Sequence, residues 1–305
     1  MAEPQQLDDE ARMPFVDHLR ELRKRLRNSI IALVFGFGVA YAFKDEIVSF
    51  LLQPCLEAWF AQQEANQALS DAVSEPRMYY TDLIGPFWAF LSLSLFAGVF
   101  ISSPFAFHQL WKFIAPGLYK HEQAYGLAFA ITSAICFIGG ALFCYYLVLP
   151  VAFEFFLGYS NESITEFAGK PVALEPIPTI DAYLRLERKL LLGFGLVFEL
   201  PLGIFFLSLI GAVTHRGLWK FNRWWFILSF LLAAALTPPD VFSQTLMAAP
   251  LIVLYNISIG IAYIMTKRRE RKEAALYEDD DPAGDQGRSE DENSDLKPPD
   301  PGSSG

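Results

Sequence analysis

The sequence predicts an all-α membrane protein with six transmembrane helices. Three observations lead to this fold class. The chain of 305 residues is 53% hydrophobic. Its apolar residues are gathered in long uncharged blocks, whereas a soluble domain would spread them with the period of a helix or a strand. Lys and Arg residues gather in the connections on one side of these blocks and are sparse on the other.

Four blocks are long enough to cross a membrane by themselves. About 20 apolar residues in a helix span the ~30 Å hydrocarbon core of a bilayer. The four blocks hold 21, 30, 25 and 26 residues and contain one charged residue, Glu199. In chain order they are residues 87–107, 124–153, 190–214 and 241–266.

Two shorter blocks, residues 28–43 and 224–239, hold 16 residues each. Their length alone is ambiguous, because a run near 14 can be a buried core helix. Counting both as spans places 16 Lys and Arg residues on one side, against Arg77 and Lys170 in the opposite loops. One span more or fewer would destroy this alternation. The basic side, which carries both termini, is predicted to be cytoplasmic.

The sequence therefore divides into three segments. Residues 1–27 form a cytoplasmic N-terminal segment that we expect to be an amphipathic helix at the membrane surface. Residues 28–266 form the transmembrane domain. Residues 267–305 form a tail that is first basic and then acidic, with 11 acidic and two basic residues from 273 onward. We expect this tail to be disordered because it has almost no apolar residues.

The external connections are uneven in length. Residues 48–83 and 151–182 are long enough for a structured external cap, and prolines in the second predict an extended part. The last external turn, at residues 237–240, is so short that the fifth and sixth helices must be an antiparallel pair.

The three cysteines have no metal-ligand spacing, and only Cys55 is expected on the oxidising side, so we predict no disulfide framework. Phosphate-binding loops and HExxH motifs are absent from the sequence. We therefore expect no cofactor, no metal, no catalytic site and no nucleic-acid partner.

Glu199 is the first candidate for a functional residue, because a carboxylate inside a span is costly and usually has a function. It lies near the middle of the predicted fourth span. The following Pro201 should bend the helix at this point, since proline cannot donate to the helix ladder. Glu199 is either a site for a proton or a partner's polar group, or a structural residue hydrogen-bonded inside the bundle.

Glu21 and Glu122 lie on the predicted cytoplasmic side. Two carboxylates there could bind guanidinium groups through bidentate, charge-assisted bonds that a lysine ammonium cannot match. The alternative is that Glu21 only pairs with Arg25, its helix partner at i+4, and that Glu122 is solvated.

Two further stretches are distinctive. Asp240 follows a double proline and is expected to cap the sixth helix, and Gln244 one turn later is an amide that would be costly in lipid. Residues 102–122 leave the second span through a proline, place aromatic residues at the interface (Phe107, Trp111 and Phe113), and break at a Pro-Gly pair.

The chain closely resembles the TatC family, the multi-spanning receptors of the twin-arginine protein translocase. Five motifs, spread from about residue 14 to 265 and in family order, carry the resemblance. They are His18-Leu-Arg-Glu21-Leu-Arg-Lys-Arg-Leu26, Ser103-Pro-Phe, Gln109-Leu-Trp-Lys-Phe-Ile-Ala-Pro-Gly-Leu-Tyr-Lys-His-Glu122, Phe198-Glu-Leu-Pro201 and Leu236-Thr-Pro-Pro-Asp-Val-Phe-Ser-Gln244.

The resemblance implies a curved six-helix bundle in the inner membrane of a bacterium. It also implies a receptor for twin-arginine signal peptides of folded cargo, working in several copies with single-span TatA- and TatB-type subunits and the proton gradient. By similarity, Glu21 and Glu122 would receive the two arginines, with Arg23 and Phe113 on the same surface. Glu199 would meet polar groups of the single-span partners. Pro54, Tyr145, Asp240 and Gln244 match positions tied to export or to the external side.

Two features depart from the family pattern: the charges at Arg185, Glu187, Arg188 and Lys189, and a first external loop that is longer than usual. Two other functions remain open. A secondary transporter would use Glu199 as a proton or ion site, but it predicts an internal repeat that the sequence does not clearly show. An intramembrane enzyme would need a nucleophile or metal set that the spans do not supply.

Overall fold

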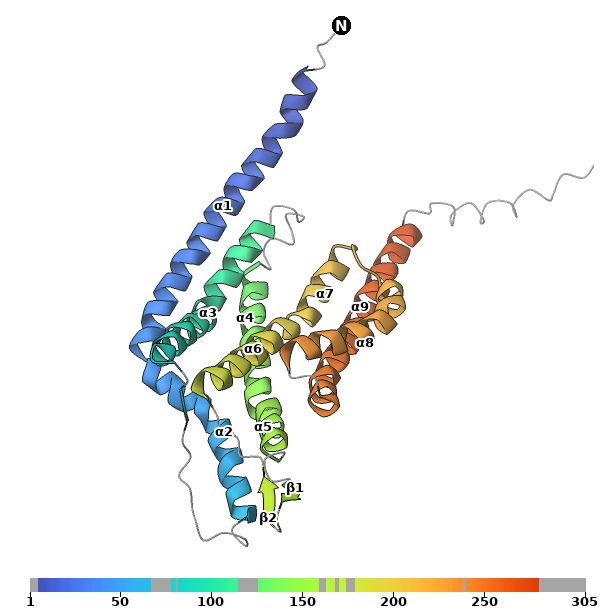
Figure 1. The fold of residues 1–305 in the computed structure, drawn as a ribbon. Coiled ribbons are helices and arrows are strands. Elements are labelled where there is room, and N and C mark those ends of the chain that lie inside the picture. Colours follow the sequence, from blue (N-terminus) through green and yellow to red (C-terminus); the bar gives the residue numbers. More distant parts are fainter. Residues whose placement is uncertain are drawn as a thin grey trace, which may run out of the picture.

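The computed structural model describes residues 5–66, 78–80, 82–114, 126–158, 163–167, 170–173, 179–237 and 240–279. These residues are helical except for short connections and one small hairpin (Figure 1). In chain order the elements are α1 (Gln5–Ala42), α2 (Lys44–Asn66), α3 (Gly85–Ile114), α4 (Gly126–Phe143), the π-helical turn η3 (Cys144–Val148), α5 (Leu149–Gly158), β1 (Ser163–Phe167), β2 (Lys170–Ala173), α6 (Ile180–Phe198), α7 (Leu200–Leu209), α8 (His215–Leu236) and α9 (Val241–Asp279).

Four segments of the described chain are long and apolar enough to cross a membrane, and they match the four long sequence blocks. They are α3, α4 to α5, α6 to α7, and the first 28 residues of α9. A fifth candidate is α1 together with α2, which meet at an angle of 79°. The short block 224–239 lies mostly in α8, which packs along α9. The total of six spans stays a prediction.

The first predicted segment and the first predicted span belong to one helix. α1 runs without a break from Gln5 through Ala42 and packs along α3. Two glycines bring these helices together. A Cβ atom on Gly36 would lie 2.7 Å from the carbonyl oxygen of Gly98, and one on Gly98 would lie 2.7 Å from the backbone nitrogen of Phe37. Only glycine permits so close an approach of two helix backbones.

The predicted external connections carry more regular structure than their sequences indicate. α2 occupies much of the first connection as a helix through Asn66, which we did not predict. α5 continues to Gly158, so the second connection begins later than the predicted residue 151. The expected extended part is the antiparallel pair of β1 and β2. α2, α5 and the hairpin form one end of the molecule (Figure 1).

The predicted bend at Glu199 is confirmed. α6 ends at Phe198, Glu199 is a turn residue, and α7 begins at Leu200. The Glu199 amide bonds to the Leu196 carbonyl three residues earlier, a tighter pattern than the α-helix. The fourth span also begins ten residues earlier than predicted, at Ile180, because the charged residues at 185–189 are accommodated within α6.

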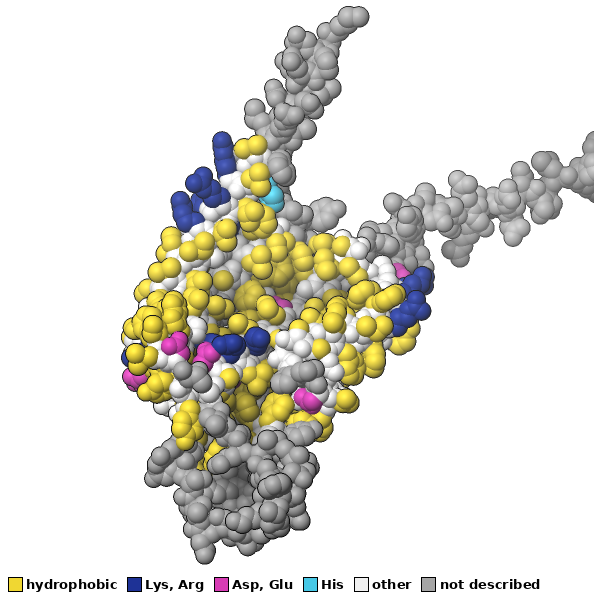
Figure 2. All heavy atoms as spheres, in the orientation of Figure 1, with side chains coloured by type: hydrophobic (Ala, Val, Ile, Leu, Met, Phe, Trp, Pro, Cys, Tyr) yellow, Lys and Arg dark blue, Asp and Glu magenta, His cyan; other side chains and the backbone are white. Residues whose placement is uncertain are grey.

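The described part of α1's N-terminal half and the end of α9 project from the same end of the molecule, opposite α2 and the hairpin (Figure 1). Figure 2 shows Lys and Arg side chains at both of these ends and a broad, hollowed hydrophobic face between them. α9 continues to Asp279, into the segment that we expected to be disordered, and residues 280–305 lie outside the described range.

Candidate functional site

The predicted arginine-binding surface lies on α1 and on the adjoining end of α3. The Glu21 carboxylate accepts a 2.9 Å charge-assisted hydrogen bond from Arg25, so the helix partner allowed by the sequence is present. Arg25 also donates to the Gln109 side chain on α3, at 3.4 Å. The Glu21 side chain keeps 29% of its surface exposed, so one face of the carboxylate stays accessible.

Ring stacking fixes this surface to α3. The His18 and Phe113 rings are stacked with centroids 4.4 Å apart, and His18 lies one turn before Glu21 on α1. The Arg23 side chain is exposed on the same helix. The structure thus places Glu21 and Phe113 at one helix pair. Glu122 lies outside the described residues.

Glu199 faces α4 at the junction of α6 and α7. Its neighbours there are the Ser133 hydroxyl and the backbone of Phe137. The Oε1 atom is buried and has no hydrogen-bond partner among the described residues. A buried carboxylate oxygen without a partner is costly, so Glu199 remains a candidate for a functional residue.

Sequence reasoning missed the connection of Glu199 to the α3 motif. The Trp111 indole donates a 3.3 Å hydrogen bond to the Ser133 hydroxyl, which lies against Glu199. Trp111 is buried and packs on Phe129 and Phe206. The ring fills the space between α3, α4 and α7 rather than facing outward, and its predicted place at the membrane interface stays a prediction. A lone serine in a span gives no sequence signal for such a role.

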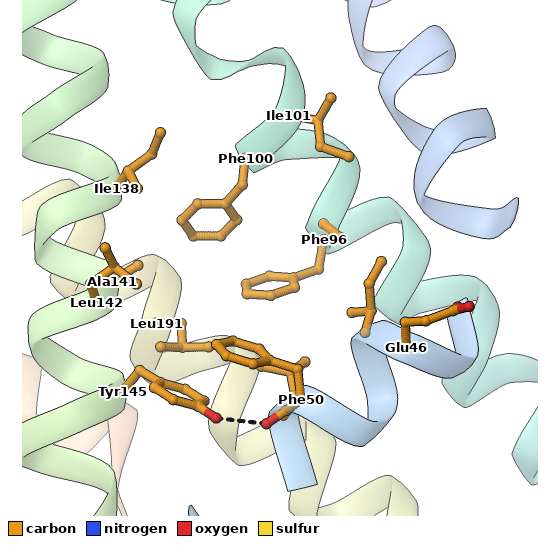
Figure 3. A pocket seen from close by; sticks show the side chains of 13 residues that line it. Glu46, Phe50, Phe96, Phe100, Ile101, Ile138, Ala141, Leu142, Tyr145 and Leu191 are labelled. Atoms are coloured by element: carbon orange, nitrogen blue, oxygen red, sulfur yellow. Dashed lines mark hydrogen bonds between the residues drawn. The ribbon is translucent and has the colours of Figure 1, made fainter. Parts of the chain in front are cut away.

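Tyr145 and Pro54 both determine the hydrogen bonding of one backbone carbonyl in α2, that of Phe50. Proline has no N–H, so Pro54 leaves the Phe50 carbonyl without its usual helix donor four residues later. The Tyr145 hydroxyl donates a 2.6 Å hydrogen bond to that carbonyl, and its ring stacks on the Phe50 ring with centroids 4.4 Å apart (Figure 3). Tyr145 and Pro54 are both buried, so this pair is structural as well as a candidate site.

Asp240 is the N-cap of α9, as predicted. Its Oδ1 atom accepts a 2.7 Å hydrogen bond from the Ser243 amide. Its second carboxylate oxygen, Oδ2, is buried and has no partner among the described residues. Gln244 lies in the first turn of α9 and is half-buried.

A cavity of about 400 Å³ lies between α2, α3 and α4 (Figure 3). Its lining is apolar apart from Glu46 at its edge and the Tyr145 hydroxyl. Glu199 does not line it. A small-molecule transporter built around Glu199 predicts a polar pocket at that residue, and this cavity is elsewhere. Among the described residues, no group of three His, Cys, Asp or Glu side chains is placed to hold a metal ion.

The fold and these residues define a multi-spanning helical membrane protein with a polar site inside the bundle and a carboxylate surface at one end. Residues 17–250 match the family model described as Sec-independent protein translocase protein (TatC). The chain belongs to this family.

Relatives of known sequence support the same assignment. The TatC protein of Magnetococcus marinus is 38% identical over 88% of this chain and 91% of its own length. The TatC protein of Koribacter versatilis is 36% identical over 86% and 90%. The crystal structure of the twin arginine translocase receptor TatC is 33% identical, with a TM-score of 0.68 over 82% of this chain and 99% of that one.

Family membership establishes the general function. The chain is a subunit of a bacterial Sec-independent protein translocase in a membrane, and its family is not a family of enzymes. The helical membrane fold predicted from the sequence is confirmed by this structural match.

Proposed function

We propose that this chain is the signal-peptide receptor of a twin-arginine translocase, and that it binds the paired arginines at the Glu21 surface of α1 and α3. The observation that carries this proposal is the partly exposed Glu21 carboxylate, already paired with a guanidinium and flanked by the stacked His18 and Phe113 rings. In this proposal the chain lies in the inner membrane with both termini in the cytoplasm, where folded cargo arrives.

The chemistry favours arginine over lysine. A planar guanidinium donates two parallel hydrogen bonds to a carboxylate, whereas an ammonium group acts as a point charge. A charge-assisted hydrogen bond contributes about 1.5–3 kcal/mol. Two carboxylates, Glu21 and Glu122, would therefore discriminate an Arg-Arg pair from Lys-Lys by geometry as well as by charge.

Glu199 is proposed to receive the single-span partners of the TatA and TatB types. Its unpartnered Oε1 atom supports this role, because a polar group of a partner helix would satisfy it inside the membrane. The Trp111 to Ser133 hydrogen bond supports a link between this site and the end of α3. Gln244 adds a second polar group in a span. Transport driven by the proton gradient would then act through the assembled complex, which contains several copies of this chain.

The test is binding of a twin-arginine signal peptide to the purified full chain in nanodiscs, with a Lys-Lys peptide for comparison. Glu21→Gln and Glu122→Gln variants are measured beside Glu270→Gln, which changes an exposed carboxylate on α9. We expect wild type and Glu270→Gln to prefer Arg-Arg by about tenfold or more, and either site variant to lose most of that preference. Equal binding of both peptides by the folded wild-type chain would overturn the proposal.

The Glu199 role is tested separately, by co-purification of co-expressed TatA- and TatB-type subunits. We expect Glu199→Gln to weaken their retention while Glu46→Gln, which alters the carboxylate at the apolar cavity, leaves it unchanged. Normal retention by Glu199→Gln, together with proton flux through the reconstituted wild-type chain alone, would favour the secondary transporter instead.

A further inference from the structure

The outer half of α6 carries a group of charges that the proposed receptor function does not use. Arg185, Arg188 and Lys189 lie within two turns of α6, with Arg185 and Lys189 on its exposed side and Arg188 half-buried against α3. Arg185 and Lys189 are exposed, with 62% of the Arg185 side chain accessible. Figure 2 shows a small group of Lys and Arg side chains within the hydrophobic face, apart from the basic ends of the molecule.

The acidic residues of α6 neutralise only part of this group. Asp181 forms an ion pair with Arg185 one turn earlier on α6. Glu187 is fully buried on the opposite side of the helix, and its carboxyl oxygens have no hydrogen-bond partner among the described residues. These are also the carboxylates that act electrostatically on Arg188. On α6 itself the accessible surface thus combines three cations with one exposed carboxylate, and Figure 2 shows further Asp and Glu side chains beside the basic group.

Arg188 is held in a fixed position by α3. Its Nη1 atom donates to the Ser92 hydroxyl and, at 3.5 Å, to the Ala89 carbonyl. A guanidinium has five N–H donors. Both of these bonds come from the Nη1 atom of Arg188. The remaining donors form a rigid fork that matches the geometry of a phosphate group.

The depth of these cations in the membrane selects the ligand. α6 and α7, with the break at Glu199 between them, together form a candidate span of 30 residues. Such a span is about 45 Å long, which equals the ~40–45 Å thickness of a bilayer with its headgroups. Arg185 and Lys189 are then about 8 and 14 Å from the outer end, at and just below the headgroup layer. Long cationic side chains at this depth extend toward the lipid phosphates.

The surface around the cations is suited to acyl chains. Leu196 lies two turns deeper on α6 and is 62% exposed. On α3, Trp88 lies one turn outward of Ser92 and is 60% exposed, as expected of an aromatic residue at a membrane interface. A charged headgroup above an apolar surface is the arrangement that a phospholipid presents to a span.

We propose that Arg185, Arg188 and Lys189 bind the phosphate of an anionic phospholipid, whose acyl chains cover the exposed side of α6 around Leu196. This site lies at the end of the bundle opposite the Glu21 surface and is independent of signal-peptide recognition. Charge favours an anionic lipid over a zwitterionic one, because three cations face one carboxylate and each cation near a membrane surface attracts anionic headgroups.

The site is tested by photo-crosslinking. The full chain, in nanodiscs of phosphatidylcholine, is given trace phosphatidylglycerol or phosphatidylcholine with a diazirine on the acyl chain, and labelled peptides of α3 and α6 are mapped by mass spectrometry. We expect phosphatidylglycerol to label α6 about tenfold more than phosphatidylcholine. The R185Q/R188Q/K189Q variant should lose this difference. The R216Q/K220Q/R223Q variant, with the same loss of charge on α8, should keep it.

Arg188→Lys serves as a second variant that keeps the charge and the fold of the span. It should lower the α6 labelling by phosphatidylglycerol about two- to fivefold, because lysine lacks the guanidinium fork. Equal labelling by both lipids, or unchanged labelling of the triple α6 variant, would overturn the proposal. Complete competition by inorganic phosphate would identify a free anion as the ligand. Complete displacement by saturating single-span subunits would identify a protein-docking surface; either result rejects the lipid site.

Discussion

The hydroxyl of Tyr145 donates to the carbonyl oxygen of Phe50, 2.6 Å away, which is the carbonyl that Pro54 leaves free within α2. An α-helix interrupted by proline loses one backbone hydrogen bond, and a buried carbonyl without a donor is costly. Here the side chain of Tyr145, which belongs to η3, supplies the missing donor. Tyr183 makes a similar 2.6 Å bond to the neighbouring Leu51 carbonyl. The sequence resemblance placed Pro54 and Tyr145 among export-related residues, and this contact makes them one structural unit.

We predict that Pro54→Ala and Tyr145→Phe are coupled in stability. In the wild-type background, Tyr145→Phe should lower the free energy of unfolding by about 0.5–1.5 kcal/mol, because it leaves the Phe50 carbonyl without a donor. In the Pro54→Ala background an alanine amide supplies that donor, so Tyr145→Phe should lower the free energy of unfolding much less. Unfolding in detergent micelles, followed by circular dichroism, completes the double-mutant cycle.

Tyr146→Phe is the matched control for this cycle, because Tyr146 is adjacent in the chain and 62% exposed. Its effect should be small in both backgrounds. If the effects of Pro54→Ala and Tyr145→Phe are simply additive, the two residues are independent and the proposed exchange of donors is wrong.

The close crossing of α1 and α3 predicts a sharp difference between two glycines. Gly98→Ala should lower the thermal unfolding midpoint, at a cost of about 1–3 kcal/mol, because the new methyl group meets the backbone of Phe37. Gly38→Ala should be neutral or slightly stabilising, since no atom lies within 4 Å of its Cβ position and alanine favours the helix. Equal midpoints for both variants would mean that the helices separate without cost.

Asp240 allows capping to be separated from export. Asparagine caps a helix as well as aspartate, whereas alanine does not. We expect Asp240→Ala to lose about 1 kcal/mol of stability and Asp240→Asn to lose little, as measured by thermal unfolding. Export by the two variants is then compared in cells. An export defect in stable Asp240→Asn would assign a function to the second carboxylate oxygen, and normal export would restrict Asp240 to capping.

The sequence predicted those features that depend on local chemistry. Uncharged blocks located the four long spans because lipid excludes charge whatever the tertiary packing. Pro201 marked the break at Glu199, and the residues before α9 marked Asp240 as its cap, since both effects act within one helical turn. The Glu21–Arg25 pair followed from i+4 spacing alone.

The missed features depend on contacts between distant segments. α2 was unexpected because its last turns carry few apolar residues, and its anchors, Tyr145 and Tyr183, lie on other helices. The early start of α6 was missed because burial of Glu187 and the bond of Arg188 to α3 cannot be deduced from spacing. The Trp111 to Ser133 bond joins residues 22 positions apart, beyond the reach of any local pattern.

The pairing of Glu21 with Arg25 leads to a prediction about affinity. An incoming arginine of a signal peptide must either replace Arg25 at the Glu21 carboxylate or share it. If it replaces Arg25, then Arg25→Gln removes a competitor. Since partly exposed ion pairs are worth about 0.3–1 kcal/mol, the affinity for an Arg-Arg peptide should rise about two- to fivefold.

Arg27→Gln is the control for Arg25→Gln, because it removes the same charge from an exposed position two residues later on α1. It also corrects for the general repulsion between a basic helix and a basic peptide, which both variants reduce. The prediction concerns the difference between them, measured by peptide titration in nanodiscs. A lower affinity for Arg25→Gln than for Arg27→Gln would show instead that Arg25 holds Glu21 and Gln109 in the binding geometry, and that the peptide shares the carboxylate rather than displacing its partner.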